Sequence, residues 1–178
     1  MWKERRAMFY GRRISLAVVA LLALMVGIPQ HAAAKGLVPF RATMTETFVV
    51  VPCDRNVLCA PITGSGQASH LGKTSEASEV FVDLLSNPAP GCHNETRTVT
   101  LTGANGDQIT LALTGQDCPT GATTGTTTTA LDSWVVTGGT GRFSGATGSG
   151  TNMALIDGPD GTSVTTFRGT LSTPGSLK

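Results

Sequence analysis

The stretch TGGTGRFSGATGSG, at residues 137–150, is the part of this chain from which its fold can be predicted. It contains a glycine pair, a tight turn and then regularly placed glycines at 145, 148 and 150. Glycine adopts backbone angles that are closed to other residues, and it lets a second chain approach closely. A strand, a Gly-Gly-Thr-Gly turn and a second strand with regular glycines are typical of a strongly bent hairpin in a closed sheet. The stretch therefore predicts a fold, and it names no reaction.

Short strands separated by turns are the pattern of the chain after residue 35. Gly, Thr and β-branched residues interrupt every helical pattern. Val99 and Leu101 alternate with threonines, and Asn105-Gly106 is a strong signal for a tight hairpin turn. The strands that we expect are 40–51, 62–70, 73–85, 95–102, 108–114, 126–137, 142–156 and 162–173.

Eight short antiparallel strands in one domain form either a sandwich or a barrel. Glycines inside the expected strands 62–70 and 142–156 indicate the sharp bends that barrel closure requires. The connections resemble consecutive hairpins, and no long strand carries the charges or prolines that protect a sheet edge. We therefore expect an all-β fold, a single eight-stranded antiparallel β-barrel. Side chains fill the interior of such a barrel, or it holds one small ligand.

The first 34 residues have the three regions of a secretory signal peptide. Five basic residues and one acid precede an apolar run over 14–28, and Ala32-Ala33-Ala34 provides a small-residue cleavage site. The run is shorter than the roughly 20 residues that span a bilayer, so cleavage is favoured over a membrane anchor. We expect a signal peptide over 1–34, one barrel domain over 35–178, and a secreted or periplasmic protein with no stable membrane anchor after cleavage.

Composition limits the partners of the mature chain. The whole chain has 13 basic and 12 acidic residues, and removal of residues 1–34 leaves 8 and 11, a net charge near −3. The mature part has no basic run and no tyrosine, and its only tryptophan is Trp134. A nucleic-acid surface needs clustered Lys and Arg, so we expect no nucleic-acid partner. We expect no cofactor, and a homo-oligomer is possible.

All four cysteines lie after the expected cleavage site. An even number beyond a signal peptide favours disulfides, and four cysteines allow three pairings among which a sequence does not choose. We expect Cys53 to pair with Cys59, closing a short loop, and Cys92 to pair with Cys118, joining two loops beside a hairpin. The spacing lacks the close pairs of zinc sites, so we expect no metal.

Residues 135–146 resemble the glycine-hairpin signature of the allene oxide cyclase and dirigent β-barrel superfamily, in a secreted bacterial-type form. Weaker similarities follow at 37–40, 66–72 and 166–171, and together they cover nearly all of the mature chain. Only the hairpin is specific. The resemblance implies a barrel that binds or steers small hydrophobic molecules in its lumen. Some members cyclise an epoxy fatty acid, and dirigent members guide the coupling of phenolic radicals. The hairpin is scaffold, so no catalytic residue carries over.

Two residues are weak candidates for catalysis. Glu46 alternates with Thr45 and Thr47, on the face of Met44 and Phe48. A carboxylate on an apolar face is a candidate lumen acid with a raised pKa, although an exposed edge residue has the same pattern. His70 lies at an expected turn, where it is either a general base or ligand anchor, or a hydrogen-bonded turn residue.

Two further residues are weak candidates for ligand binding. Trp134 either lines a pocket or fills the core, and the core is the more common place for it. Arg168 either pairs with a lumen acid or holds a ligand carboxylate, although an outward, solvated arginine is more common.

Two functions from different classes follow. The first is a secreted, disulfide-stabilised barrel that binds a small hydrophobic molecule in its lumen or serves as a stable extracellular structural domain, without clear catalysis. The alternative is an isomerase-type cyclase or steering protein acting on a lipid or polyketide-like substrate. An open lumen of about a few hundred cubic ångströms, lined by apolar residues and an acid, would favour the alternative. A lumen packed with apolar side chains would favour the structural form of the first.

Overall fold

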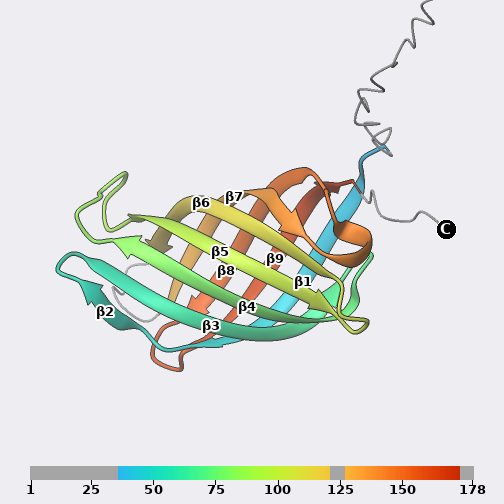
Figure 1. Ribbon diagram of the computed structural model, residues 1–178. Coiled ribbons are helices and arrows are strands. Elements are labelled where there is room, and N and C mark those ends of the chain that lie inside the picture. Colours follow the sequence, from blue (N-terminus) through green and yellow to red (C-terminus); the bar gives the residue numbers. More distant parts are fainter. Residues whose placement is uncertain (1–35, 121–126, 173–178) are drawn as a thin grey trace, which may run out of the picture. The chain divides into compact units, whose positions relative to one another are not determined.

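The computed structural model describes residues 36–120 and 127–172, which form nine antiparallel strands and one short 3-10 helix (Figure 1). The expected signal peptide over 1–34 lies outside the described residues. No helix in the described ranges is long and apolar enough to cross a bilayer. The elements are β1 (Val38–Phe48), β2 (Val51–Asp54), β3 (Val57–Ala68), β4 (Gly72–Asp83), β5 (His93–Gly103), β6 (Gln108–Pro119), β7 (Thr127–Gly139), η1 (Gly141–Phe143), β8 (Gly148–Asp157) and β9 (Thr162–Leu171).

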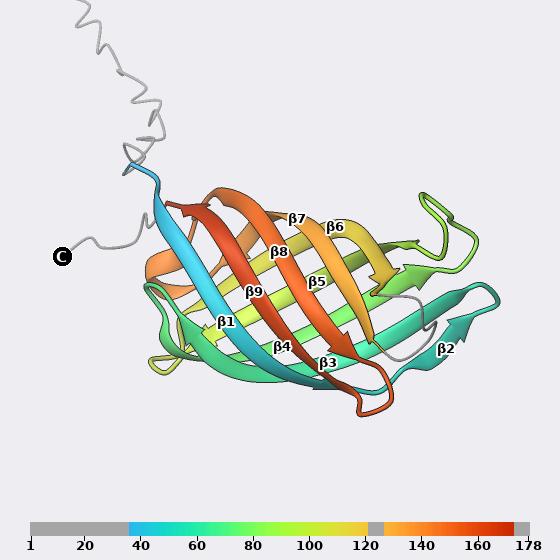
Figure 2. The same ribbon diagram turned by 180° about the vertical axis from the view of Figure 1, so that it is seen from behind.

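Eight of these strands close into a barrel, as the sequence predicts. The sheet runs β1-β9-β8-β7-β6-β5-β4-β3, and β1 also pairs with β3, which removes both edges (Figures 1 and 2). The strand β2 is an addition that the sequence analysis missed. Among the described strands it pairs with β3 alone, and it extends the β2–β3 hairpin beyond one end of the barrel.

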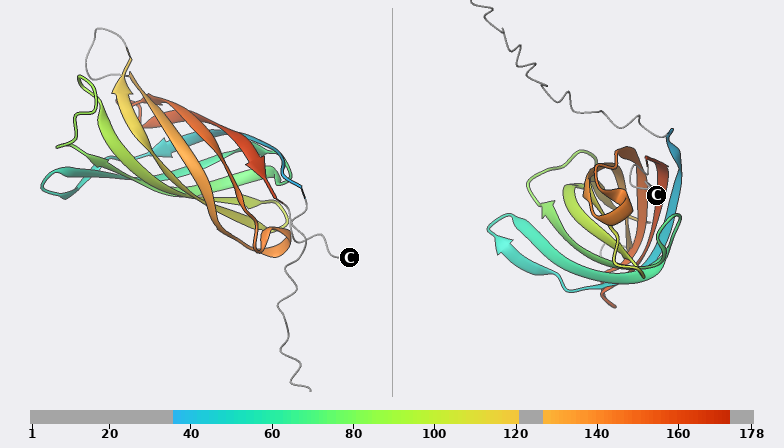
Figure 3. Two further views of the ribbon diagram at one scale, coloured as in Figure 1. Left: turned by 90° about the horizontal axis from the view of Figure 1, so that it is seen from above. Right: turned by 45° about the vertical axis from the view of Figure 1, so that its right-hand side comes forward.

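The glycine-rich stretch 137–150 differs from its expected hairpin in one respect. The predicted strand 142–156 is wrong over its first part, because Gly141–Phe143 forms the 3-10 turn η1 and β8 begins only at Gly148. Gly141 and Gly145 have φ values of +57° and +71°, in the left-handed region that glycine favours. Phe143 is fully buried, and η1 lies across this end of the barrel (Figure 3). The stretch therefore closes one end of the lumen.

Trp134 is the largest side chain in the closed half of the barrel, and glycines make room for it. It is 1% exposed, and its ring meets that of Phe40 edge to face, with centroids 5.6 Å apart. Its indole N–H donates a hydrogen bond to the carbonyl of Thr151 at 3.0 Å. Gly150 and Gly169 pair with each other on β8 and β9, and a Cβ at Gly150 would lie 2.6 Å from the indole. Trp134 is thus a core residue.

Alternation along the strands fills this closed half with apolar side chains. Residues of one face of each strand point inward, because successive side chains of a strand point to opposite faces. The buried core contains Phe40, Ala42, Met44, Ala68, Leu71, Val99, Leu101, Ile109, Leu111, Leu113, Trp134, Phe143, Ala146, Phe167 and Leu171. The inward placement of Val99 and Leu101, and of the three apolar residues of β6, confirms the expected alternation. Half of the lumen is therefore packed shut.

Candidate functional site

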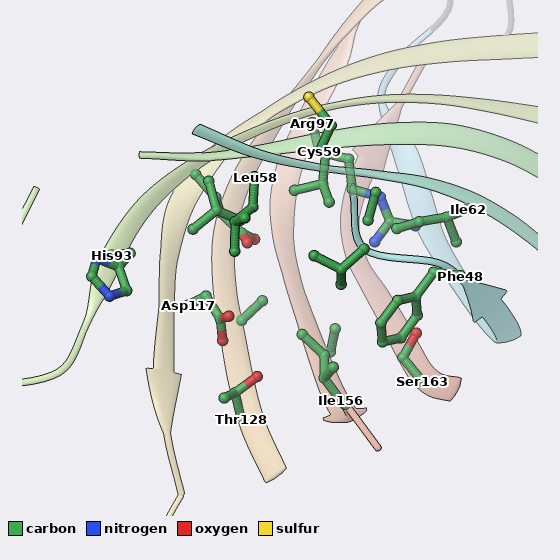
Figure 4. Close-up of a pocket in the computed structure, with 18 of the residues that line it drawn as sticks. Phe48, Leu58, Cys59, Ile62, His93, Arg97, Asp117, Thr128, Ile156 and Ser163 are labelled. Atoms are coloured by element: carbon green, nitrogen blue, oxygen red, sulfur yellow. The ribbon is translucent and has the colours of Figure 1, made fainter. Parts of the chain in front are cut away.

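The other half of the lumen is open and contains a cavity of about 240 Å³ (Figure 4). It lies between the strand ends opposite η1, at the end of the barrel from which β2 extends. The wall is apolar and includes Phe48, Val50, Leu58, Ala60, Ile62, Val80, Val82, Leu84, Ala130, Ala154 and Ile156. The lining also includes charged and hydroxyl side chains, which we call the floor of the cavity, namely Glu46, Glu95, Arg97, Asp117 and Ser163. The site is therefore an apolar cup with a charged floor.

Arg97 is the centre of one buried polar network in this floor. Its Nη2 donates to Glu46 Oε1 at 2.8 Å and also to Glu76 Oε1. Its Nε donates to the hydroxyl of Ser78 at 3.1 Å. The hydroxyl of Ser163 donates to the second oxygen of Glu46 at 2.5 Å. Both acids and Arg97 are almost fully buried, so the network holds two carboxylates around one guanidinium out of contact with bulk water.

A glycine allows the two acids of this network to converge. Gly64 on β3 pairs with Glu46 on β1 at one side and with Glu76 on β4 at the other. A Cβ at Gly64 would lie 3.0 Å from the Cγ of Glu46 and 3.5 Å from the Cβ of Glu76. The missing side chain thus leaves the space that both carboxylates need to reach Arg97.

A second group of acidic side chains lies on β5, β6 and β7, and here too a glycine leaves the space that the side chains need. Gly115 on β6 pairs with Glu95 on β5 and with Asp132 on β7. A Cβ at Gly115 would overlap the Asp132 side chain and the Leu131 carbonyl. Glu95 is 6% exposed and Asp132 is 5% exposed. Asp117 lies two residues after Gly115 on the same strand and lines the cavity.

Burial makes several of these carboxyl groups weak acids. Burial, together with the nearby Asp132 and Asp117 carboxyl groups, raises the pKa of Glu95 to about 9, and the Arg97 charge opposes this shift only weakly. Burial raises the pKa of Glu76 to about 7, although the Arg97 charge opposes the shift. Burial also raises the pKa of Asp132. Glu95 is consequently protonated near neutral pH and able to donate a hydrogen bond.

Several buried polar atoms of this layer have no hydrogen-bond partner among the described residues. Both carboxylate oxygens of Asp132 and both polar atoms of the Asn152 amide are in this position, and these residues pair across β7 and β8. The others are Glu76 Oε2, Asp117 Oδ1 and Thr165 Oγ1. Buried polar groups of native proteins are nearly always hydrogen-bonded, and exceptions concentrate at functional sites. These unpaired polar atoms therefore gather in the middle layer of the lumen.

The structure brings one of the four candidate residues to the cavity. Glu46 is 1% exposed and lies in the lumen, as its alternation with threonines indicates. His70 lies at the β3–β4 turn with φ +68°, and its Nε2 is 3.0 Å from the Pro39 carbonyl, far along the barrel from the cavity. Trp134 packs in the closed half, and Arg168 is exposed on the outer face of β9. Neither lines the cavity.

The sequence analysis missed the acids and the arginine that make up most of the floor. Glu95 and Arg97 precede Val99 and Leu101 with the same alternation, which places them on the lumen face of β5. That pattern was available in the sequence, because charged residues on an apolar face are unusual. Asp132 alternates in the same way with Ala130 and Trp134 on β7.

Both expected disulfides are present, and both lie at the open end of the barrel. Cys53 on β2 is bonded to Cys59 on β3, and Cys59 lines the cavity. Cys92 precedes β5 and is bonded to Cys118 near the end of β6, with Cα atoms 4.2 Å apart. The disulfides therefore constrain the hairpin and the loop that surround the cavity mouth. Within 36–120 and 127–172, no three His, Cys, Asp or Glu side chains are grouped so as to hold a metal ion.

Comparisons with known proteins show the fold and leave the function open. No protein-family model matches the sequence, and no curated protein matches it. The pterocarpan synthase dirigent protein PsPTS1 matches with a TM-score of 0.51 and 10% identity, over 79% of this chain and 97% of that one. The pterocarpan synthase dirigent protein GePTS1 matches with a TM-score of 0.48 and 11% identity, over 78% and 88%. The match to PsPTS1, together with the closed eight-stranded sheet, shows that the fold of this chain is a dirigent-like β-barrel.

Proposed function

We propose that the protein binds a small, mostly apolar molecule in the open half of its barrel. The observation that carries this proposal is the cavity of about 240 Å³, which has an apolar wall and a few polar groups at its floor. Small-molecule sites have this composition, because apolar walls supply affinity and a few polar groups fix orientation. A purely structural barrel has no need for an open half, since eight strands enclose a space that side chains can fill.

A substitution that fills the cavity with a larger side chain tests whether a ligand binds there. Ala154 lines the cavity and is 2% exposed, so Ala154→Phe places a ring in the ligand volume. Ala77 lies on the exposed face of β4, so Ala77→Phe is the matched control. We expect the wild-type protein and Ala77→Phe to bind the neutral fluorophore 1-naphthalenemethanol, and Ala154→Phe to lose binding while keeping the far-UV spectrum of a folded barrel. Equal binding by all three proteins, or none by the wild type, would refute the proposal.

A steering or cyclisation reaction is the second candidate, and the open, apolar lumen with the buried acid Glu95 is the observation that favours it, by the criterion set out for the sequence. A carboxyl group that remains protonated at neutral pH is suited to donate a proton to a developing oxyanion, as in general acid catalysis. Glu95 lines the apolar cavity, and its burial raises its pKa to about 9. An allene oxide cyclase-like reaction on a lipid epoxide is the test: wild type would give one enantiomer in excess, and Glu95→Gln a racemic product. A racemic product with both proteins would exclude this candidate.

We also propose that the protein is secreted, as a bacterial-type member of this barrel group. Two disulfides support an oxidising compartment, and they agree with the basic, apolar and small-residue order of residues 1–34. Intact-mass measurement of the exported protein is the test, with a chain beginning at Lys35 and lacking four hydrogens as the expected result. A cell-associated chain that retains residues 1–34 would contradict it.

A further inference from the structure

Three neighbouring strands of the barrel, β7, β8 and β9, carry a group of apolar side chains on their outer face. Figure 2 shows these strands side by side on one side of the barrel. The group consists of Leu131, Met153, Leu155 and Val164, which are each between 49% and 58% exposed, and we call it the outer patch. It is contiguous, because Leu131 pairs with Met153 across β7 and β8, and Leu155 pairs with Val164 across β8 and β9.

The outer patch is a local feature, and it does not reflect the general composition of the outer surface. The outward positions of β5 are one asparagine and four threonines, and those of β6 are glutamine and threonine apart from one alanine. Single exposed apolar residues are normal on a monomer, whereas a contiguous group on an otherwise polar sheet marks a surface that another molecule covers.

Charges of opposite sign lie at the two ends of the outer patch. Arg168 on β9 pairs with Arg41 on β1, and both are exposed on the side of the patch nearer η1. Asp157 at the end of β8 and Asp160 in the β8–β9 turn are exposed on the other side. Between these ends, the outward side chains of the described strands β7, β8 and β9 are uncharged. None of the four charged residues forms an ion pair within the described ranges.

The positions of these charges match a two-fold arrangement of two copies. Ala154 marks the middle of the patch along β8, and Asp157 follows it by three positions. Thr151, which pairs with Arg168, precedes Ala154 by three positions. When β8 of one copy lies antiparallel on β8 of a second copy, centred at the level of Ala154, Asp157 of each copy reaches the level of Arg168 of the other. A parallel arrangement would instead place Asp157 opposite its own equivalent.

The area of this face is sufficient for a dimer of moderate strength. The four half-exposed side chains of the outer patch present on the order of 400 Å². The threonines and serines around them extend the face toward the roughly 800 Å² per partner of a standard interface. An apolar centre with a polar and charged rim is also the usual composition of a protein–protein interface.

We propose that two copies of this protein form a symmetric dimer through the outer faces of β7, β8 and β9, with the outer patch at the centre and Asp157–Arg168 pairs at both edges. The dimer goes beyond the proposed binding function and does not depend on it. The patch lies on the outside of the barrel, whereas the cavity lies inside it and opens at one end, so dimerisation leaves the cavity accessible.

Sedimentation equilibrium of the disulfide-intact protein, from about 1 to 500 µM, measures the association, and we expect a monomer–dimer equilibrium with a micromolar dissociation constant. Leu155→Lys places a charge at the centre of the patch and should weaken the dimer by about tenfold or more, because burial of an unpaired charge is costly. Leu85→Lys is the matched control, since Leu85 is 73% exposed in the turn after β4, and it should stay within about threefold of the wild type.

An exchange of charges tests the antiparallel orientation. Asp157→Arg and Arg168→Asp, made singly, each place like charges opposite one another at both edges, and each should weaken the dimer by about tenfold or more. The double variant restores opposite charges and should return the dissociation constant to within about threefold of the wild type. A double variant as weak as the single variants would overturn the inference.

Binding of 1-naphthalenemethanol and the far-UV spectrum report on the cavity and the fold of each variant separately from its association. We expect all four variants to remain folded and to bind this probe as the wild type does. A wild-type protein that stays monomeric, that forms a trimer, or whose dimer survives Leu155→Lys would overturn the inference, whether or not the probe binds. A dimer that responds to these substitutions in a protein that does not bind the probe supports the inference and refutes the binding function alone.

Discussion

Replacement of Glu95 by glutamine should stabilise the protein at alkaline pH and change little at acidic pH. The structure supplies the reason, since Glu95 is 6% exposed in the lumen, and burial together with Asp132 and Asp117 raises its pKa from 4.5 to about 9. In the folded protein this carboxyl group therefore stays protonated where the same group in the unfolded chain has ionised. Glutamine has the size of the protonated acid and never ionises.

The sign and size follow from linkage. Between pH 4.5 and pH 9 the folded state holds a proton that the unfolded state has lost, so raising the pH favours unfolding. The contribution of Glu95 is fully favourable below about pH 4.5 and is lost progressively as the pH rises through about 9. Each pKa unit corresponds to about 1.4 kcal/mol, so the full loss is on the order of 6 kcal/mol. Glu95→Gln should remove this loss.

Urea unfolding with intact disulfides, at pH 5, 6, 7, 8 and 9, measures the free energy of unfolding of both proteins. We expect the advantage of Glu95→Gln over the wild type to grow by up to about 1.4 kcal/mol per pH unit. Glu79→Gln makes the same substitution on the exposed face of β4, and its difference from the wild type should stay within about 0.5 kcal/mol at every pH. An advantage of Glu95→Gln that is flat with pH, or that shrinks, would show that Glu95 ionises normally in the folded barrel.

Three further changes test the structure by the free energy of unfolding. Arg97→Met leaves two buried carboxyl groups without their cation and should cost about 3–5 kcal/mol at pH 8. The cost should be smaller at pH 5, because burial raises the pKa of Glu76 to about 7 and Glu76 is then protonated; an equal cost at both values would contradict the network. Gly150→Ala forces a methyl group against the Trp134 indole and should cost about 1–3 kcal/mol by urea unfolding, whereas a neutral effect would mean that the indole lies elsewhere. A disulfide that closes a longer loop restricts the unfolded chain more, so its removal should cost more stability. Replacing Cys92 and Cys118 by serine, at a separation of 26 residues, should cost about 3.5 kcal/mol, and replacing Cys53 and Cys59, at a separation of 6, about 2 kcal/mol. The reverse order of the two costs would contradict this explanation.

Local patterns in the sequence predict most of the barrel. Alternation of apolar and polar residues placed Val99 and Leu101 inward, and the Asn105-Gly106 dipeptide marked the β5–β6 turn, where Gly106 has φ +86°. These signals are readable because the side chains of a strand alternate with a period of two and because tight turns need particular residues. The same reasoning placed Glu46 on the inner face of its strand.

Long-range contacts account for what local patterns missed. The 3-10 turn η1 replaces the first part of a predicted strand, because Phe143 finds a buried place at the end of the lumen that only the closed barrel provides. The strand β2 exists only as the partner of β3. Neither feature has a signature within its own few residues.

The cavity and its chemistry depend most of all on the tertiary structure. Alternation alone predicts that Glu95, Arg97 and Asp132 face inward. It does not predict which acids form ion pairs with Arg97 and which have no cationic partner among the described residues. That division follows from barrel closure, which brings β1, β4 and β5 to one side of the floor and β5, β6 and β7 to the other. Gly64 and Gly115 set the spacing, since each leaves a gap between two acids on flanking strands. Sequence patterns thus reveal the direction of each side chain, whereas its neighbours, and hence its charge, depend on strands far apart in the chain.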